Sequence, residues 1–199
     1  MTTSLEALAL TLHDIGAIQF GRFRLHSGGE SRIYFDLRVL VSFPDALRQA
    51  TAAYRGLLET LEFDLLAATP LAGLPLGTAL CLDMDRPLIY PRKTAKSYGT
   101  GKNIEGHWSI GQTAVVIDDL ITSGDSLLET IATIKAAGLK VSDAVVLIDR
   151  EQGGRAMLAE QGYHVHAVAT VSELLGILQE KGRLNQSQLD EVLSSLNLR

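Results

Sequence analysis

The sequence predicts an α/β fold, with a central, mostly parallel sheet flanked by helices. Short apolar runs of strand length recur along the chain, and this pattern is typical of strands buried on both faces. The runs cover residues 63–68, 88–90, 114–117, 144–148 and 164–169. Stretches of helical period lie between most of them, as in right-handed βαβ units, so we expect a doubly wound sheet.

Helices are predicted where apolar side chains recur at helical spacing next to helix start or stop signals. The predicted helices cover residues 4–15, 44–61, 74–82, 126–137, 154–161, 172–181 and 187–196. A candidate capping box, Thr3 with Glu6, begins the first helix, and Pro44 suits the first turn of the second. Ser172 and Ser187 are plausible N-caps for the last two helices.

Two stretches lie outside this alternation. Residues 20–41 alternate in polarity around a Ser-Gly-Gly break, which predicts a hairpin or two short strands. Residues 93–109 contain few apolar side chains, and Gly99, Gly101 and Gly106 would make the segment mobile. A loop of this length inside a compact domain is usually functional or disordered.

Length, charge and cysteine content exclude several classes of protein. We expect one domain over residues 1–199, because this length is ordinary for a domain with a sizeable core. The net charge of −5 argues against nucleic-acid and anionic-membrane binding, and at first against any anionic ligand. The lone Cys81 excludes an internal disulfide and fits a reducing compartment. With no apolar run of membrane length and no secretory signal pattern, a cytoplasmic protein is expected.

The most informative segment is the predicted strand, loop and helix from Ala114 to Ser126. Four apolar residues lead into adjacent acids, Asp118 and Asp119, and a Thr-Ser-Gly turn follows. Ligands of open α/β sheets bind beyond the carboxyl ends of the strands, and free N–H groups at a helix N-terminus favour phosphate. A phosphorylated sugar would suit both features, with the acids on ribose hydroxyls or Mg²⁺ and the loop on the 5′-phosphate.

The alternative for this segment is an ordinary turn between a strand and a helix. In that case Ser123 or Asp125 would act as the N-cap of the following helix. The whole string favours function, because strand, acids, turn and helix follow in the order that a phosphate site requires.

This string resembles the phosphoribosyl pyrophosphate (PRPP) binding motif of type I phosphoribosyltransferases. Three further stretches resemble motifs of the orotate phosphoribosyltransferases in that family's order, and they are residues 23–38, 92–99 and 147–154. The resemblance extends from about Phe20 to Leu178. It implies the type I phosphoribosyltransferase fold. That fold would have a core over about residues 42–170, a small hood from about 18–41 and the C-terminal part, and a mobile flap over about 93–109.

The resemblance also implies an activity: Mg²⁺-dependent transfer of ribose 5-phosphate from PRPP to orotate. The products would be orotidine 5′-monophosphate and pyrophosphate, in the pyrimidine (UMP) biosynthetic pathway. The bond to pyrophosphate breaks with oxocarbenium-like charge on the sugar, so catalysis depends mostly on positioning and electrostatics. The family's flap reaches the site of a second subunit, so a homodimer is implied as well.

The family's pattern assigns roles to residues of this chain. The implied catalytic residues are Lys96, Asp118 and Asp119, and either acid is a candidate ligand for Mg²⁺ that arrives with PRPP. The implied PRPP-binding residues are His26, Leu71, Ala72, Arg92, Lys93, Lys96, Tyr98, Asp118, Asp119, Leu120, Ile121, Thr122, Ser123, Gly124, Asp125 and Ser126. The implied orotate-binding residues are Tyr34, Phe35, Thr122 and Arg150, whose guanidinium fork suits a planar carboxylate.

Several positions depart from the family's pattern. His26 stands where the family usually has lysine, and Leu71 and Ala72 stand where many members have Tyr-Lys or Tyr-Thr. Arg32 replaces a usual proline, and Thr94 replaces the usual glutamate of the flap. These changes remove polar contacts at the pyrophosphate end, so we expect weaker PRPP binding than in members with the full set.

Two other functions stay open on this evidence. One is a phosphoribosyltransferase that acts on another base, such as a purine or xanthine, and Arg150 argues against it because purine bases carry no carboxylate. The other is a non-catalytic sensor of PRPP or nucleotides on the same fold. The cations Lys93 and Lys96 of the flap argue against a sensor.

Overall fold

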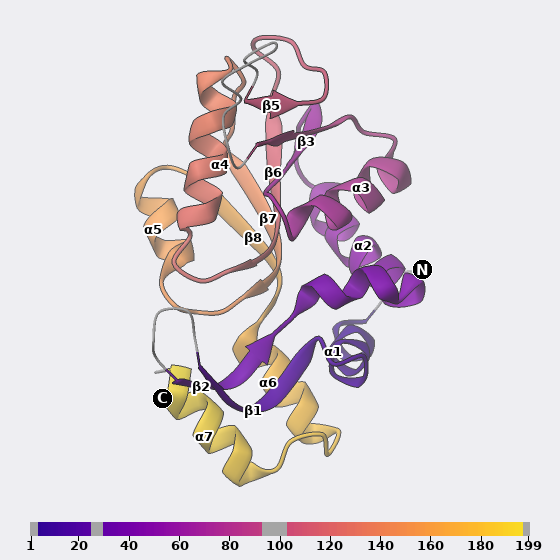
Figure 1. Ribbon diagram of the computed structural model, residues 1–199, viewed down its shortest axis with the longest axis vertical. Helices are drawn as coiled ribbons and strands as arrows, with labels where there is room; N and C mark the ends of the chain where they lie inside the picture. The colour runs from indigo at the N-terminus through magenta and orange to yellow at the C-terminus, as the bar shows by residue number, and fades with distance from the viewer. Residues whose placement is uncertain (1–3, 25–29, 93–102, 197–199) are drawn as a thin grey trace.

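The computed structural model describes residues 4–24, 30–92 and 103–196 (Figure 1). Its central sheet has six strands in the order β5-β4-β3-β6-β7-β8. The strands are β3 (Leu65–Ala68), β4 (Leu88–Pro91), β5 (Ile104–Glu105), β6 (Ala114–Ile121), β7 (Asp143–Asp149) and β8 (His164–Thr170). All pairs are parallel except β4 with β5, which confirms the predicted mostly parallel sheet. Each of the five apolar runs forms a strand.

All seven predicted helices are present within a few residues of their expected ends. They are α1 (Leu5–Asp14), α2 (Pro44–Leu58), α3 (Gly73–Met84), α4 (Asp125–Ala136), α5 (Gly154–Glu160), α6 (Val171–Glu180) and α7 (Gln186–Leu196). Figure 1 shows α4 and α5 on one face of the sheet and α2 and α3 on the other. None of the helices in the described ranges is long and apolar enough to cross a bilayer.

The strands are apolar on both faces because each face packs against helices. Successive side chains of a strand point to opposite faces. Val116 and Val146 therefore join one core with α4 and α5, whereas Val115 and Val145 join another with α1, α2, α3, α6 and α7. Burial on both faces explains why the runs lack the polar alternation of a half-exposed strand.

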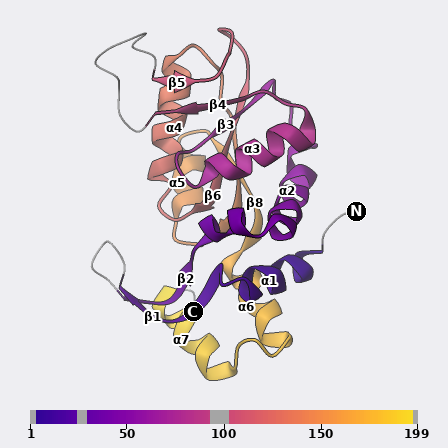
Figure 2. The same cartoon turned by 45° about the vertical axis from the view of Figure 1, so that its right-hand side comes forward.

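The predicted hairpin forms a separate two-stranded antiparallel sheet of β1 (Ile18–Arg24) and β2 (Glu30–Phe35). Beyond β2 the chain turns into a 3₁₀ helix, Leu37–Ser42, where the sequence had predicted continued strand. Figure 2 shows α7 beside this small sheet, and the Arg32 N–H donates to Ser195 Oγ at 3.3 Å. The N-terminal hairpin and the last helix thus pack against each other.

The helix caps differ from the sequence expectations. Thr3 lies outside the described residues, and Ser4 Oγ accepts from the Ala7 N–H at 3.2 Å, so Ser4 caps α1. The serine caps predicted for α6 and α7 are wrong, because Thr170 and Asn185 occupy those positions. Thr170 forms a capping box with Glu173, a T-x-x-E pattern that the sequence displays.

The segment predicted as one long loop, residues 93–109, contains the short strand β5. Pairing of Tyr90 with Glu105 fixes this part of the chain against β4. Gly106 has a φ of 100°, and a Cβ there would lie 2.7 Å from the carbonyl oxygen of Leu88. The expectation that Gly106 supplies mobility is therefore wrong, since this glycine permits a close backbone approach. Gly99 and Gly101 lie outside the described residues.

The capping box of α6 gives the first testable prediction. Thr170→Ala removes the hydroxyl that accepts from Glu173 N and should lower the free energy of unfolding by about 1 kcal/mol. Ser172→Ala is the matched control and should change it by less than about 0.5 kcal/mol, because Ser172 lies inside the first turn. Urea unfolding of both variants measures the difference. A larger loss for Ser172→Ala would restore the original assignment.

Candidate active site

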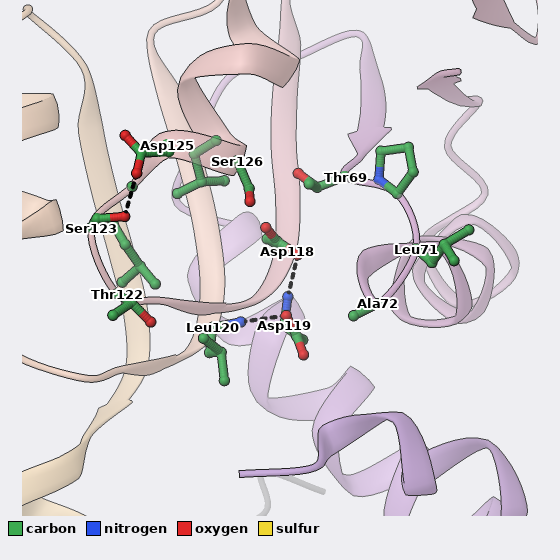
Figure 3. Close-up of a pocket in the computed structure, with 14 residues that line it drawn as sticks. Thr69, Leu71, Ala72, Asp118, Asp119, Leu120, Thr122, Ser123, Asp125 and Ser126 are labelled. Atoms are coloured by element: carbon green, nitrogen blue, oxygen red, sulfur yellow. Dashed lines mark hydrogen bonds between the residues drawn. The ribbon is translucent and has the colours of Figure 1, made fainter. Parts of the chain in front are cut away.

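A cavity of about 200 Å³ opens at the carboxyl ends of β3 and β6 (Figure 3). Its lining combines the turn after β3, namely Thr69, Pro70, Leu71 and Ala72, with residues 118–127. The cavity therefore brings together both acids, the Thr-Ser-Gly turn and the Leu71–Ala72 pair. It lies where ligands of open α/β sheets bind.

The two acids belong to β6 itself. The sequence predicted that the strand would end before them, but β6 continues to Ile121 and carries both carboxylates. Asp118 is buried, and its Oδ1 accepts from the backbone N–H of Asp119 at 2.9 Å. Asp119 Oδ1 in turn accepts from the N–H of Leu120 at 2.9 Å (Figure 3). Each carboxylate is thus fixed by the peptide that follows it.

Burial gives this pair an unusual protonation equilibrium. Loss of solvent, together with the negative charge of Asp119, raises the pKa of Asp118 to about 8. Burial also raises the pKa of Asp119, which the positive charge of Arg38 partly opposes. The pair therefore takes up a proton more readily than ordinary carboxyl groups do. The buried Thr69 hydroxyl makes no hydrogen bond of ordinary geometry, although it is close enough to Asp118 to lower that pKa.

The turn after β6 leaves the start of α4 open for a ligand. Gly124 occupies the N-cap position with a φ of 91°, and no side chain caps the helix. Ser123 Oγ donates to Asp125 Oδ2 at 2.7 Å, so neither side chain caps the helix. The alternative of an ordinary turn capped by Ser123 or Asp125 is therefore wrong. Uncapped N–H groups at the positive end of a helix are suited to a phosphate.

Gly154, at the start of α5, packs against this turn. Gly154 N donates to the carbonyl oxygen of Thr122 at 3.0 Å. A Cβ on Gly154 would lie 2.4 Å from that same oxygen, and a Cβ on Gly124 would lie 2.4 Å from Leu158. The start of α5 and the phosphate turn thus pack with no room for a side chain. The sequence did not reveal this packing, because Gly124 was assigned to PRPP binding and Gly154 only to the motif around Arg150.

Arg150 and Phe35 come together although they are far apart in the sequence. The Arg150 guanidinium carbon lies 5.7 Å from the centroid of the Phe35 ring. Its Nε is buried and has no hydrogen-bond partner among the described residues, and burial lowers the pKa of Arg150. A buried guanidinium nitrogen without a partner favours a site for an anion.

Tyr34, predicted beside Phe35 at the base, faces the other way. Successive residues of β2 point to opposite faces, and the Tyr34 ring stacks on Phe23 with centroids 5.4 Å apart. Its hydroxyl accepts from Arg38 Nη2 at 3.0 Å. The structure therefore groups Phe35 with Arg150 but directs Tyr34 toward the other face of β2.

The predicted pyrophosphate end is described only in part. Arg92 forms an ion pair with Glu105 and lines a cavity of about 610 Å³ that also contacts Thr69 and Ser126. Leu71, at 66% exposure, projects into solvent. Glu105 is a site neighbour that sequence reasoning missed. The predicted site residues that lie outside the described residues are His26, Lys93, Lys96 and Tyr98.

The acid pair fits a metal ion that arrives with its own ligands. In the described parts of the chain, no three His, Cys, Asp or Glu side chains are grouped so as to hold a metal ion. Mg²⁺ takes oxygen ligands and is usually bound through one or two carboxylates together with substrate phosphates. Asp118 and Asp119 offer that partial set beside the phosphate turn.

The buried acid predicts a pH-dependent stability. Because folding raises the pKa of Asp118 from 3.8 to about 8, its contribution is favourable below pH 4 and is lost as pH rises toward 8. Asp118→Asn cannot ionise, so it should stabilise the protein by on the order of 2 kcal/mol at pH 8.5 and much less at pH 4. Urea unfolding at both pH values measures this change.

Asp45→Asn is the control for this prediction, since the Asp45 side chain is 93% exposed. It should shift the free energy of unfolding by less than about 0.5 kcal/mol at either pH. Equal stabilisation by Asp118→Asn at pH 4 and pH 8.5 would contradict the raised pKa.

Several known proteins are similar to this chain in sequence or in fold. The model of the phosphoribosyl transferase domain family matches residues 44–160. A Nostoc protein named bifunctional enzyme PyrF/PyrE is 42% identical over 184 residues, which cover 92% of this chain and 39% of that protein. A Cenarchaeum symbiosum protein named orotate phosphoribosyltransferase is 38% identical over 184 residues, covering 89% of this chain and 90% of that protein.

A solved structure agrees with these relatives. Leishmania donovani UMP synthase superposes with a TM-score of 0.89 at 37% identity, over 98% of this chain and 42% of that protein. The chain thus spans about two fifths of the Nostoc and Leishmania proteins. These matches confirm the predicted type I phosphoribosyltransferase fold. The chain belongs to the phosphoribosyltransferase family and, within it, to the orotate phosphoribosyltransferases.

Proposed function

We propose that this chain transfers ribose 5-phosphate from PRPP to orotate, giving orotidine 5′-monophosphate and pyrophosphate in pyrimidine (UMP) biosynthesis. The observation that carries the proposal is the buried Arg150 Nε beside Phe35, which has no hydrogen-bond partner in the part of the chain that the structure describes. A planar aromatic carboxylate such as orotate would supply the anion that this guanidinium lacks and a ring face for Phe35. Family membership supports the same substrate.

PRPP would bind across the cavity at the end of β6. Asp118 and Asp119 accept from the ribose hydroxyls, and residues 120–126 surround the 5′-phosphate with N–H groups and hydroxyls. The pyrophosphate would lie toward Leu71 and Ala72, which line the same cavity. Arg92, with His26, Lys93, Lys96 and Tyr98 from outside the described residues, completes the proposed PRPP site. Thr122 completes the proposed orotate site, to which Tyr34 would contribute a backbone edge because its ring stacks on Phe23.

Catalysis would then rest on placement and charge. The buried acid pair holds the ribose and favours the positive charge that develops on the sugar as the bond to pyrophosphate breaks. Lys96 on the flap neutralises the leaving pyrophosphate, and the closed flap excludes water that would otherwise attack PRPP. Mg²⁺, bound to the PRPP phosphates and to one or both acids, would neutralise phosphate charge.

The organisation of the protein follows from the same proposal. We infer a core over about residues 42–170, a hood from about 18–41 and the C-terminal part, and a flap over about 93–109. The flap would be shared across the interface of a homodimer. A reducing, cytoplasmic location suits the lone Cys81.

The deciding experiment is consumption of orotate, followed by absorbance, with PRPP and Mg²⁺. We expect turnover with orotate and none with adenine, hypoxanthine or xanthine. Turnover of a purine without turnover of orotate would indicate the enzyme for another base. Binding of PRPP without turnover of any base would instead support a sensor. Leu71 and Ala72, which depart from the family's pattern, motivate this second candidate.

Arg150→Lys tests in the same assay whether Arg150 recognises orotate. Lysine keeps the charge but loses the fork, so KM for orotate should rise about tenfold or more while KM for PRPP stays within about twofold. Arg86→Lys is a matched control, because Arg86 also lies over an aromatic ring, Phe63, at 5.5 Å, but is exposed, whereas Arg150 Nε is buried. Equal effects of the two variants would remove Arg150 from orotate recognition.

Gly154→Ala tests the support beneath the phosphate turn. The added Cβ would meet the Thr122 oxygen at 2.4 Å, so the turn must shift, and KM for PRPP should rise about tenfold. Gly176→Ala is the control, because its Cβ would meet nothing within 4 Å on α6. Calorimetric titration with PRPP and Mg²⁺ measures binding directly. Unchanged PRPP affinity in Gly154→Ala would show that the turn tolerates the shift.

A further inference from the structure

Tyr54 connects the helix α2 to the acid pair from inside the core. Its side chain is fully buried, and its hydroxyl donates to the backbone carbonyl oxygen of Asp118 at 2.5 Å. The two residues are 64 positions apart in the sequence. Among the described residues, no other side chain donates a hydrogen bond to this carbonyl.

The hydroxyl acts where the regular pairing of β6 changes. The partner strand β3 pairs with β6 only as far as Ile117, so the acids lie beyond its end. On the other side, β6 keeps one register with β7, which joins Asp118 to Val146 and Leu120 to Ile148. At the two acids β6 is therefore paired with one strand instead of two.

One planar peptide links Tyr54 to the Asp118 carboxylate. The carbonyl that accepts from Tyr54 belongs to the same peptide as the Asp119 N–H, which donates to Asp118 Oδ1 at 2.9 Å. Because the peptide is rigid and planar, fixing its oxygen also fixes the direction of its N–H. A rotation of this peptide would move the Asp118 carboxylate and reorient the start of Asp119.

We propose that Tyr54 is a positioning residue for the Asp118–Asp119 pair, whose hydroxyl holds the peptide between the acids so that both carboxylates face the PRPP ribose. This inference rests on the proposed function of the cavity. The aromatic ring of Tyr54 packs in the core, and only its hydroxyl contacts the Asp118 carbonyl.

The hydroxyl stays a donor at every working pH. Burial and the neighbouring acids raise the pKa of Tyr54 well above its ordinary value of 10. The groups that face it, Asp118 and Asp119, are negative or share a proton, and either state leaves the phenol neutral. The hydrogen bond is thus a permanent part of the fold that no ionisation of Tyr54 interrupts.

The test removes the Tyr54 hydroxyl and compares the effect with removal of another buried hydroxyl on α2. Tyr54→Phe keeps the ring, and loss of one hydrogen bond to a buried carbonyl should weaken PRPP binding about tenfold. Orotate affinity, measured without PRPP, should stay within about twofold. Thr51→Val is the control, because Thr51 is also buried on α2 but donates to Leu47 within the helix.

Calorimetry with PRPP and Mg²⁺ gives the readout without requiring any base. Similar losses of stability in the two variants, with PRPP weakened only in Tyr54→Phe, would support positioning. PRPP affinity within twofold of the wild type in Tyr54→Phe would overturn it and leave the proposed function intact. Failure of the wild-type protein to bind PRPP would overturn the proposed function and this inference together.

A double-mutant cycle keeps the inference testable if Tyr54→Phe folds poorly. Asp118→Asn should stabilise the fold at pH 8.5, so the double variant is measured in that background. If Tyr54 acts through the acids, its loss should weaken PRPP by no more than about threefold once Asp118 is replaced. Full additivity of the two losses would overturn the inference.

Discussion

The burial of two adjacent carboxylates at the end of β6 is the constraint on which this structure depends. Desolvation disfavours both charges, and the pKa of Asp118 rises to about 8 as a result. The fold tolerates the pair because backbone N–H groups of β6 itself donate to the two carboxylates. Such a pair is unfavourable for stability alone, which is why its retention at a cavity indicates binding.

The segment after β7 shows how one short motif can serve both ends of a site. Arg150 N donates to the Ile121 oxygen, and Gly154 N donates to the Thr122 oxygen, so the two turns run side by side. Between them, Glu151 adopts a φ of 55° and accepts from the Ser172 N–H at the start of α6. Backbone hydrogen bonds thereby join the segment of the proposed orotate contact to the turn after β6, and the Glu151 carboxylate joins it to the start of α6.

Much of this arrangement could be predicted from the sequence, and the exceptions have physical causes. Strands were predictable because burial on both faces leaves an apolar run, as in β7. The extent of β6 was not, because Asp118 and Asp119 are polar although they continue the strand. Contacts such as Tyr54 with Asp118, or Arg150 with Phe35, join residues that only the tertiary fold brings together. The sequence around Tyr54 does not indicate which distant group accepts from its hydroxyl.

Net charge is a poor guide to the ligand here, because the charges are distributed unevenly. Among the described residues, those that line the cavity at the end of β6 include no lysine or arginine, and the nearby Arg92 is paired with Glu105. An anion that enters would meet N–H groups and hydroxyls from the turn, and its repulsion by the acids is reduced by the proton that they share. Net charge alone therefore does not exclude an anionic ligand, because the charge of −5 is a sum over the whole chain whereas the N–H dipoles at the start of α4 act locally.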